Sequence, residues 1–404
     1  MKQAVILAAG KGTRCYPLTL TRPKVLLKVA NKTLLEHNLE QLEGLVTDAI
    51  IVIGYMGEKV KEVIGVRFGK LRITYVEQKE VNGTGGALLA CERLLDDRFL
   101  VLNGDDLYSR EDIKRCISHD FCVVGKTVDN PENFGVLQLK GKYVTGFEEK
   151  PKNPSSAIIG VGLYVFDLSI FEHKLKKTIR GEYEIIDYVT YLVKKGKKVF
   201  CENVQDYWLP VGYPWHILDA NEFLLKRMKP IIASDAVIEK GATLKGNVSV
   251  GHRTVIKAGA YIEGPAMIGD DCTIGPNCFI RGCTTLGNGC RVNNGTEVKN
   301  SVFFNQSYAS HLSYVCDSVL GEHVNIGAGT IVANLRHDGA VVASMVDGVL
   351  VPTVRRKFGA VCGDYAKTGI HTSIYPGRKL WPYATTLPGE IVTKDKMTEK
   401  SETP

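Results

Sequence analysis

The chain has 404 residues, a formal net charge of +7, 24% charged residues and 44% hydrophobic residues. This length is too great for one ordinary hydrophobic core, so two or three domains are expected, and the composition is that of a globular protein. No apolar run is long enough to cross a membrane. The mild positive charge suits anionic small molecules, and neither a nucleic acid nor a membrane is expected as a partner.

The chain begins directly with a strand-like run rather than a secretory signal. Its eleven cysteines are an odd number and contain no C-x-x-C pair. This pattern favours a reducing compartment, so a cytoplasmic protein is expected.

The first 228 residues alternate between apolar strand-like runs and helix-like stretches. This alternation predicts a Rossmann-like, doubly wound α/β domain over residues 1–228. Ligands of such sheets bind at the carboxyl ends of the strands, so the loops that follow strands should form the site. The runs read as strands are AVILAA, AIIVIG, RITYVEQ, FLVLNGD, FCVVGKTV and GVGLYVFD.

A glycine-rich loop, GKGTR, follows the first of these runs but fits neither common nucleotide-binding pattern. Backbone N–H groups of such a turn bind phosphate oxygens. Arg14 and Lys24 add two cations, which suits a triphosphate together with a second phosphate and predicts attack of one phosphate on another. Asp105, after FLVLNG, is placed to hold Mg²⁺ between the phosphates and is favoured over its neighbour Asp106.

After Lys229 the hydrophobic pattern changes to a period of six. Small residues stand two positions before the later aliphatic residues. This period predicts a left-handed parallel β-helix of hexapeptide repeats over residues 229–380, with the aliphatic side chains inside and the small ones at corners. The twelve aliphatic positions are Ile232, Ile238, Leu244, Val250, Ile256, Ile262, Ile268, Ile274, Ile280, Leu286, Val292 and Val298.

The period breaks after Val298 and resumes at Leu320. Residues 336–356 do not fit the repeat, and the sequence VDGV within them is typical of a hairpin turn. An excursion of this kind is where a site would be built. The charged residues 381–404 are expected to form a largely disordered tail.

Cysteines at 272, 278, 283 and 290 could be read as a zinc site. Three of them, Cys272, Cys278 and Cys290, occupy the small corner position, where Thr and Ala also occur. Packing is therefore the better interpretation.

Arg281 and Lys299 are eighteen residues apart, which is one full coil of three hexapeptides. They should therefore stack on the same edge of adjacent coils. Two stacked cations without nearby acidic partners predict a phosphate clamp. His311 lies in the register break and does not follow the core pattern.

The stretch LAAGKGTRCYPLTLTRPKVLL closely resembles the opening of the sugar-1-phosphate nucleotidylyltransferases, whose pattern is GxGTRxxPLTxxxPK. The resemblance covers roughly residues 1–225. It implies that Arg14 and Lys24 are catalytic and that Asp105 binds Mg²⁺. The implied nucleotide contacts are Ala9, Gly10, Gly12, Thr13, Gln78, Gly83 and Thr84, and the implied sugar-phosphate contacts are Gly135, Glu149, Lys150 and Gly162.

One departure from that family concerns the metal. The family usually has a second metal carboxylate in a W-x-D-x-G stretch, and here Pro210 stands at that position in WLPVG. Either Asp105 holds Mg²⁺ with phosphates and water alone, or another carboxylate such as Asp206 assists.

The stretch HLSYVCDSVLGEHVNIGAGTIVANL resembles the acetyltransferase domain of the bifunctional enzymes that make UDP-N-acetylglucosamine. The resemblance implies acetyl-CoA as co-substrate, His311 as general base and a contact between acetyl-CoA and Ala328. It weakens after Asn334, because Leu335 replaces the family's Tyr, and the later tail resembles archaeal-type sugar nucleotidyltransferases. The implied acceptor contacts are Arg281, Lys299, Tyr314, Asn325 and Asn334.

The favoured interpretation is a bifunctional enzyme that acetylates glucosamine 1-phosphate and then couples N-acetylglucosamine 1-phosphate to UTP. A galactosamine acceptor and dTTP in place of UTP remain open. One alternative is a nucleotidylyltransferase that makes a UDP-, dTDP- or GDP-sugar and has a purely structural β-helix. Another is a non-catalytic regulatory binding protein. By analogy with related prisms, a homo-oligomer is expected, either a trimer or a hexamer formed from two trimers.

Overall fold

A computed structural model describes residues 1–149, 151–178 and 181–398 of the chain. It contains two compact units, which are described separately. Unit 1 comprises Met1–Lys11, Pro23–Leu26 and Leu34–Pro210, and unit 2 comprises Gly12–Arg22, Leu27–Thr33 and the residues from Val211 onward. The compact units thus change at residue 211, earlier in the chain than the predicted domain boundary at residue 228, and two short segments near the N-terminus also group with the second unit.

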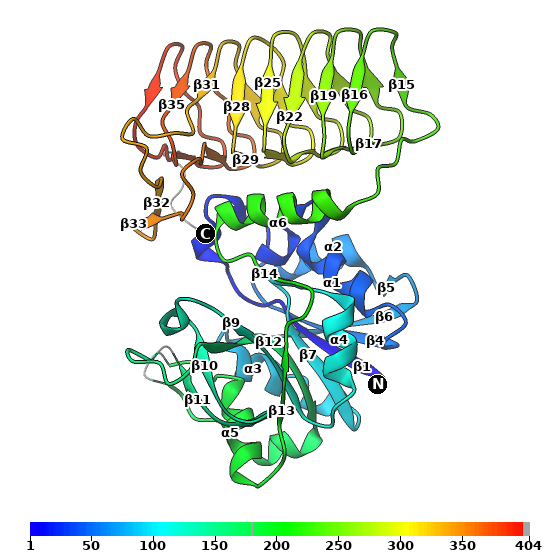
Figure 1. Cartoon of the computed structure of the whole chain (residues 1–404), viewed down its shortest axis with the longest axis vertical. Coiled ribbons are helices and arrows are strands. Elements are labelled where there is room, and N and C mark those ends of the chain that lie inside the picture. Colours follow the sequence, from blue (N-terminus) through cyan, green and yellow to red (C-terminus); the bar gives the residue numbers. More distant parts are fainter. Residues whose placement is uncertain (150, 179–180, 399–404) are drawn as a thin grey trace. The chain divides into compact units, whose positions relative to one another are not determined.

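Unit 1 is built on a ten-stranded sheet in the order β10-β11-β13-β9-β12-β7-β1-β4-β6-β5. Strands β7, β1, β4 and β6 run parallel, whereas β12 runs antiparallel to β7 and β9. The parallel part is the predicted Rossmann-like sheet (Figure 1). The strands are β1 (Gln3–Leu7), β4 (Asp48–Ile53), β5 (Arg67–Phe68), β6 (Leu71–Glu77), β7 (Arg98–Asn103), β9 (Cys122–Thr127), β10 (Gly135–Lys140), β11 (Tyr143–Glu149), β12 (Ile158–Asp167) and β13 (Phe200–Asn203).

Both faces of this sheet are buried. Along β1, Ala4 and Ile6 join one apolar cluster while Val5 joins the other, because successive side chains of a strand point to opposite faces. Beside the sheet, β8 (Asp106–Tyr108) and β14 (Trp208–Pro210) form an antiparallel pair. The helices are α1 (Leu34–Leu42), α2 (Gly57–Ile64), α3 (Thr84–Leu89), α4 (Arg110–Ile117) and α5 (Ile186–Lys194).

Unit 2 is a prism of three parallel sheets, which the chain visits in turn (Figure 1). The first sheet has β15 (Val237–Ile238), β18 (Val255–Ile256), β21 (Thr273–Ile274), β24 (Arg291–Val292), β27 (Tyr308–Ala309) and β30 (Asn325–Ile326). The second has β16 (Thr243–Lys245), β19 (Tyr261–Glu263), β22 (Phe279–Arg281), β25 (Glu297–Lys299), β28 (Tyr314–Cys316), β31 (Ile331–Val332), β35 (Ser373–Ile374) and β37 (Ile391–Val392). The third has β17 (Val248–Val250), β20 (Ala266–Ile268), β23 (Thr284–Leu286), β26 (Val302–Phe303), β29 (Val319–Leu320), β34 (Val361–Cys362) and β36 (Lys379–Leu380).

The period of six explains the core of this β-helix. The nine predicted aliphatic positions from Val250 to Val298 are all at most 2% exposed. The first positions differ, since Ile232 is 50% exposed and Ile238 is 39% exposed. They belong to the first coil, which has no preceding coil to cover it.

The register break arises from two steps of five residues instead of six. The inward-facing residue after Val298 is Phe303, five positions later, and the one after Val315 is Leu320, again five positions later. All four of these residues are buried. As a result β25 pairs with β28 at a spacing of seventeen residues, with Glu297 opposite Tyr314.

The excursion at residues 336–356 contains the predicted hairpin, formed by β32 (Ala343–Val346) and β33 (Val349–Pro352). Its two turn residues, Asp347 and Gly348, both have positive φ, as a two-residue hairpin turn of this type requires. The predicted tail begins too early, because β37 pairs with β35 and Lys396 pairs with Leu380. The β-helix therefore continues past residue 380, and residues 399–404 lie outside the described part.

Helix α6 (Pro214–Arg227) packs against the third sheet of the β-helix. Asn221, which is 0% exposed, donates to the carbonyl of Cys283 at 2.8 Å and accepts from the hydroxyl of Thr285 at 2.7 Å. Its amide oxygen also accepts from the backbone N–H of Ala30 at 3.0 Å. These bonds explain why α6 and residues 27–33 group with the β-helix.

The eleven cysteines are free and buried. In the described residues no group of three or more His, Cys, Asp or Glu side chains could hold a metal ion, and the corner cysteines pack in the core. No helix in the described ranges is both long and apolar enough to span a bilayer.

Candidate functional site

The glycine-rich loop after β1 is divided between the two units. In unit 1, Ala9 is buried and its carbonyl accepts from the N–H of Tyr55 at 3.1 Å. A Cβ at Gly10 would have no atom within 4 Å, so the backbone there borders open space. In unit 2, Gly12 has a φ of 66° and precedes the short helix Thr13–Cys15. Exposed Arg14 lies over the ring of Tyr213, at 5.3 Å from its centre.

In unit 1 the structure brings together Lys24 and Asp105. The ammonium of Lys24, whose side chain is 9% exposed, lies 2.5 Å from a carboxylate oxygen of Asp105. The Asp105 side chain is 36% exposed. A nearly buried cation beside a partly exposed carboxylate at the carboxyl end of β7 can bind phosphate and a divalent cation together.

Asp106 has a different environment from its neighbour Asp105. It is buried and accepts a hydrogen bond from the indole N–H of Trp208 at 3.1 Å. Burial, followed by the negative charge of Asp105, raises the pKa of Asp106 to about 7. Asp106 therefore links β8 to β14, while Asp105 faces outward.

Pro210 pairs with Asp106 at one end of the two-stranded β8–β14 ladder. Asp206 precedes β14 at the other end, where its backbone N–H donates to Asp112 at 3.2 Å. Trp208 pairs with Tyr108, three residues or about 10 Å along the strand from Asp105, and Asp206 lies two residues beyond that end of the ladder. Asp206 is therefore remote from Asp105 along this ladder, and Asp105 could hold Mg²⁺ together with phosphate oxygens and water. That set is typical of Mg²⁺, which keeps several waters.

The predicted base contacts follow β6. Gln78 is buried, and its amide donates to the carbonyl of Gly83 at 3.0 Å. Gly83 has a φ of 102°, and a Cβ there would overlap the carbonyl oxygen of Tyr183. The hydroxyl of Thr84 accepts from the N–H of Ile185 at 3.0 Å. The loop thus requires glycine at 83. Gln78 holds it through the Gly83 carbonyl, and Ile185 holds it through the Thr84 hydroxyl.

The predicted sugar-phosphate contacts lie on β10, β11 and β12. Gly135 pairs with the backbone of Glu149. Gly162, with a φ of 78°, lies at a register shift of β12, and its carbonyl accepts from the hydroxyl of Tyr108 at 3.1 Å. Lys150 lies outside the described residues.

On the β-helix, Arg281 and Lys299 are direct neighbours in the register of β22 and β25, as predicted. The expectation that they have no acidic partners is wrong. Arg281 donates to Glu297 at 2.8 Å, and Lys299 lies 3.6 Å from Asp317. Glu297 is the diagonal neighbour of Arg281 on the adjacent strand, a pairing that linear separation conceals.

His311 is exposed at the corner between the first and second sheets. Its carbonyl accepts from the N–H of Gly329 at 3.2 Å, which places Ala328 and Gly329 one coil further along. Tyr314 begins β28 just after this corner, and Asn325 begins β30 just before the next one. Burial raises the pKa of Tyr314 above its ordinary value, so its hydroxyl stays protonated at neutral pH.

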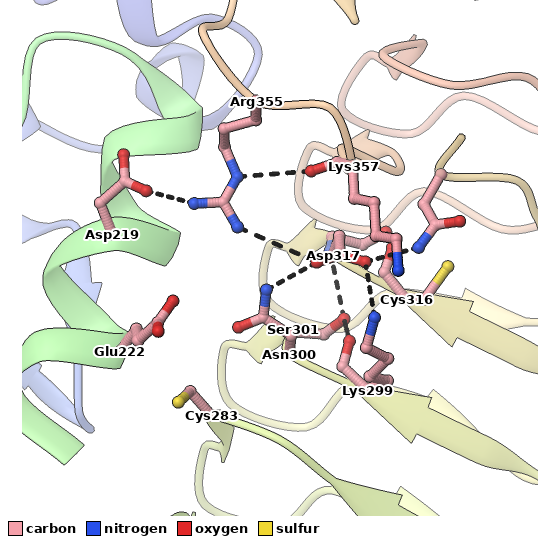
Figure 2. Close-up of polar contacts among 12 residues, drawn as sticks. Asp219, Glu222, Cys283, Lys299, Asn300, Ser301, Cys316, Asp317, Arg355 and Lys357 are labelled. Atoms are coloured by element: carbon pink, nitrogen blue, oxygen red, sulfur yellow. Dashed lines mark hydrogen bonds and ion pairs between the residues drawn. The ribbon is translucent and has the colours of Figure 1, made fainter. Parts of the chain in front are cut away.

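A second cluster of polar residues lies where β25, β28 and β31 end, and its central residue, Asp317, was missed by sequence reasoning. Asp317, 4% exposed, accepts from the amides of Asn300 and Asn334, both at 2.6 Å, and lies near Lys299. Figure 2 shows that Asp317 also faces Arg355 at the foot of the excursion. The seventeen-residue spacing of Asn300, Asp317 and Asn334 was the signal that could have identified it.

Comparisons with known proteins cover both units. A family model described as Nucleotidyl transferase matches residues 3–227, and one described as GMPPB C-terminal domain matches residues 262–368. The chain is 41% identical over 380 residues to the Bifunctional protein GlmU of Methanocaldococcus jannaschii. The match covers 93% of this chain and 91% of that protein.

It is also 36% identical over 400 residues to the bifunctional sugar-1-phosphate nucleotidylyltransferase/acetyltransferase of Sulfurisphaera tokodaii, covering 97% of this chain and 98% of that protein. Among solved structures, a UDP-glucose pyrophosphorylase complexed with UDP-glucose matches with a TM-score of 0.52 and 23% identity. The match covers 56% of this chain and 100% of that one, and it supports the fold alone.

Proposed function

The chain belongs to the family of bifunctional sugar-1-phosphate nucleotidylyltransferase/acetyltransferases, and from this premise we propose how its two sites act. It is a nucleotidyltransferase and an acetyltransferase. The proposed overall reaction is acetyl transfer from acetyl-CoA to glucosamine 1-phosphate, followed by uridylyl transfer from UTP with release of pyrophosphate. The product is UDP-N-acetylglucosamine.

In the uridylyl transfer, a phosphate oxygen of N-acetylglucosamine 1-phosphate attacks the α-phosphorus of UTP. The bond from that phosphorus to the bridging oxygen breaks, and pyrophosphate leaves. Stabilising the extra charge on the phosphates is most of the catalytic task. Lys24 supplies a positive charge at the Asp105 carboxylate. Arg14, which belongs to the same sequence motif, would supply a second positive charge to the phosphates. Gln78 and the glycine at 83 would hold the base.

Asp105 would hold Mg²⁺ together with phosphate oxygens and water. When bound, the ion neutralises charge on the two phosphates and aligns them for displacement. Asp106 contributes to this site by fixing β8 against β14 through Trp208.

In the acetyl transfer, the amine of glucosamine 1-phosphate attacks the thioester carbon of acetyl-CoA, and the CoA thiolate leaves. His311 would accept the proton that the amine loses. Arg281 and Lys299 would bind the phosphate, although each must share its charge with a carboxylate. A three-residue strand spans about 10 Å, so a sugar phosphate lying across β28 could contact both of its ends.

The observation that carries this proposal is the register of Arg281 against Lys299 on adjacent coils, with Lys299 and Asn334 both in contact with the Asp317 carboxylate. A purely structural β-helix has no need for this set. The test is release of free thiol from acetyl-CoA with glucosamine 1-phosphate, compared with glucose 1-phosphate. Thiol release with glucosamine 1-phosphate but not with glucose 1-phosphate supports the proposal. No release with glucosamine 1-phosphate or with galactosamine 1-phosphate would leave a monofunctional nucleotidylyltransferase.

We also propose that the β-helices associate into trimers or pairs of trimers. Exposed aliphatic side chains on and beside the second sheet support association, including Ile331, Ile370 and Ile391, which are 46%, 52% and 61% exposed. The eleven free thiols support a reducing compartment, the cytoplasm. Sedimentation at several concentrations tests the assembly.

A further inference from the structure

Asp317 is a buried carboxylate that contacts four donor side chains on three segments of unit 2. It follows β28, and its side chain is only 4% exposed. One carboxylate oxygen accepts from Asn300 and the other from Asn334, each at 2.6 Å. Figure 2 shows Lys299, Asn300 and Arg355 directed at this carboxylate. Burial of a charge is unfavourable unless it is paired, and these four contacts provide the pairing.

The two asparagines flank Asp317 along the axis of the prism. Asn300, Asp317 and Asn334 are each seventeen residues apart, and therefore occupy equivalent places on three successive coils. The backbone N–H of Asp317 donates to the carbonyl of Lys299 at 2.9 Å, which continues this stacking. Only a carboxylate offers an acceptor oxygen to both neighbours, because an amide has one acceptor and one donor group.

Two residues of this cluster belong to the proposed acceptor site, Lys299 and Asn334. The ammonium of Lys299 is 3.6 Å from Asp317, a distance of electrostatic attraction rather than hydrogen bonding. The contact therefore orients Lys299 without using its N–H donors. The Asn334 amide has a second N–H and a carbonyl oxygen beyond its bond to Asp317.

Arg355 connects the same carboxylate to the excursion and to α6. Its guanidinium lies 3.9 Å from Asp317, pairs with Asp219 of α6, and donates to the carbonyl of Lys357 at 3.4 Å. Two cations and two carboxylates thus balance in charge around the end of β28. The excursion is held at its foot by the same group that orients Lys299.

We propose that Asp317 is a positioning residue of the acetyl-acceptor site, which fixes Lys299 and Asn334 for binding the sugar phosphate and anchors Arg355. This role rests on the proposed acetyl transfer. Without the carboxylate, Lys299 loses its nearest negative charge and one asparagine loses its acceptor. Both side chains can then adopt other rotamers, which weakens binding of the phosphorylated acceptor.

The test is Asp317→Asn in the full-length enzyme. Asp317 has a φ of 46°, and asparagine tolerates this left-handed conformation as well as aspartate does, so the substitution keeps the backbone and the side-chain size, removes the charge and replaces one acceptor oxygen by an NH2 donor. The matched control is Asp338→Asn, which removes the surface pair of Asp338 with Arg336 in the same excursion. Acetyl transfer is followed by thiol release at varied glucosamine 1-phosphate, and uridylyl transfer is measured on the same preparations.

We expect the KM for glucosamine 1-phosphate to rise roughly 10- to 100-fold in Asp317→Asn, with uridylyl transfer and the KM for acetyl-CoA unchanged. Asp338→Asn should behave as wild type. A merely structural role would lower kcat through loss of active enzyme and leave the KM as it was, and that result would overturn the proposal. If the wild-type enzyme itself releases no thiol, the acetyl-transfer function fails and the role of Asp317 fails with it.

Discussion

Lys24 and Asp105 form an ion pair of 2.5 Å between an ammonium that is almost buried and a carboxylate that is partly exposed. They are 81 residues apart in the chain and meet because the segment around Lys24 lies against the carboxyl end of β7. The pair holds the Lys24 charge in place before any phosphate arrives. A pre-organised charge of this kind favours a transition state in which phosphate oxygens gain charge.

Lys24→Met should lower kcat for uridylyl transfer by roughly 100- to 1,000-fold, because the charge is lost and the aliphatic stem is kept. Acetyl transfer by the same preparation should be unchanged. Pyrophosphate release from UTP and N-acetylglucosamine 1-phosphate is the measurement.

The control for this variant is Lys2→Met. Lys2 forms an ion pair of the same length with Asp96, but both side chains are more than half exposed. Exposed pairs contribute little, so Lys2→Met should retain full activity. Equal losses in the two variants would show that Lys24 acts through folding rather than catalysis.

Asp106 predicts a pH dependence of stability. Burial and the Asp105 charge raise its pKa to about 7 in the folded state, above the ordinary value of the unfolded chain. The folded state therefore binds more protons than the unfolded state between about pH 4 and pH 7, and stability from this group falls as the pH rises through that window. In the Asp106→Asn variant the side chain cannot ionise but can still accept the hydrogen bond from Trp208. The unfolding free energy of this variant minus that of the wild type should therefore increase from pH 5 to pH 7.5. Urea midpoints at both pH values measure this, and a constant difference would contradict the raised pKa.

The repeat in the sequence specified the β-helix because one aliphatic residue every six positions can be buried only in such a prism, and Ile262 and Ile280 lie where it places them. Sequence also located Lys24 and Asp105, since strand ends and a motif identify them. It missed Asp317 because two five-residue steps change the coil from eighteen residues to seventeen. It missed the pairing of Arg281 with Glu297 because diagonal neighbours appear only once the strands are in register. The grouping of α6 with unit 2 depends on side-chain hydrogen bonds of Asn221, which have no sequence period.

Gly83 should be intolerant of any side chain. Gly83→Ala combines a φ of 102° with a Cβ that overlaps the Tyr183 carbonyl, so the loop must move and Gln78 loses its acceptor. We expect uridylyl transfer to fall about tenfold or more, with a higher KM for UTP. Gly141→Ala is the control, because Gly141 also has a positive φ of 61° but a Cβ there meets nothing within 4 Å. Equal effects in both variants would assign the loss to backbone strain alone.

The final prediction concerns Arg22 and Asp364, which form an ion pair of 2.5 Å inside unit 2, with side chains 10% and 5% exposed. Asp364→Asn removes the nearer of the two carboxylates that pair with the Arg22 guanidinium and leaves Glu322 at 3.2 Å, and we expect a loss of about 3 kcal/mol in unfolding free energy. Since Arg22 ends the segment Gly12–Arg22 that carries Arg14, uridylyl transfer should also decrease. The matched control is Asp271→Asn, which breaks the exposed pair with Arg253 on the same β-helix and should leave the urea midpoint nearly unchanged. A stable Asp364→Asn protein with full uridylyl transfer would show that this ion pair neither stabilises unit 2 nor positions the segment of Arg14.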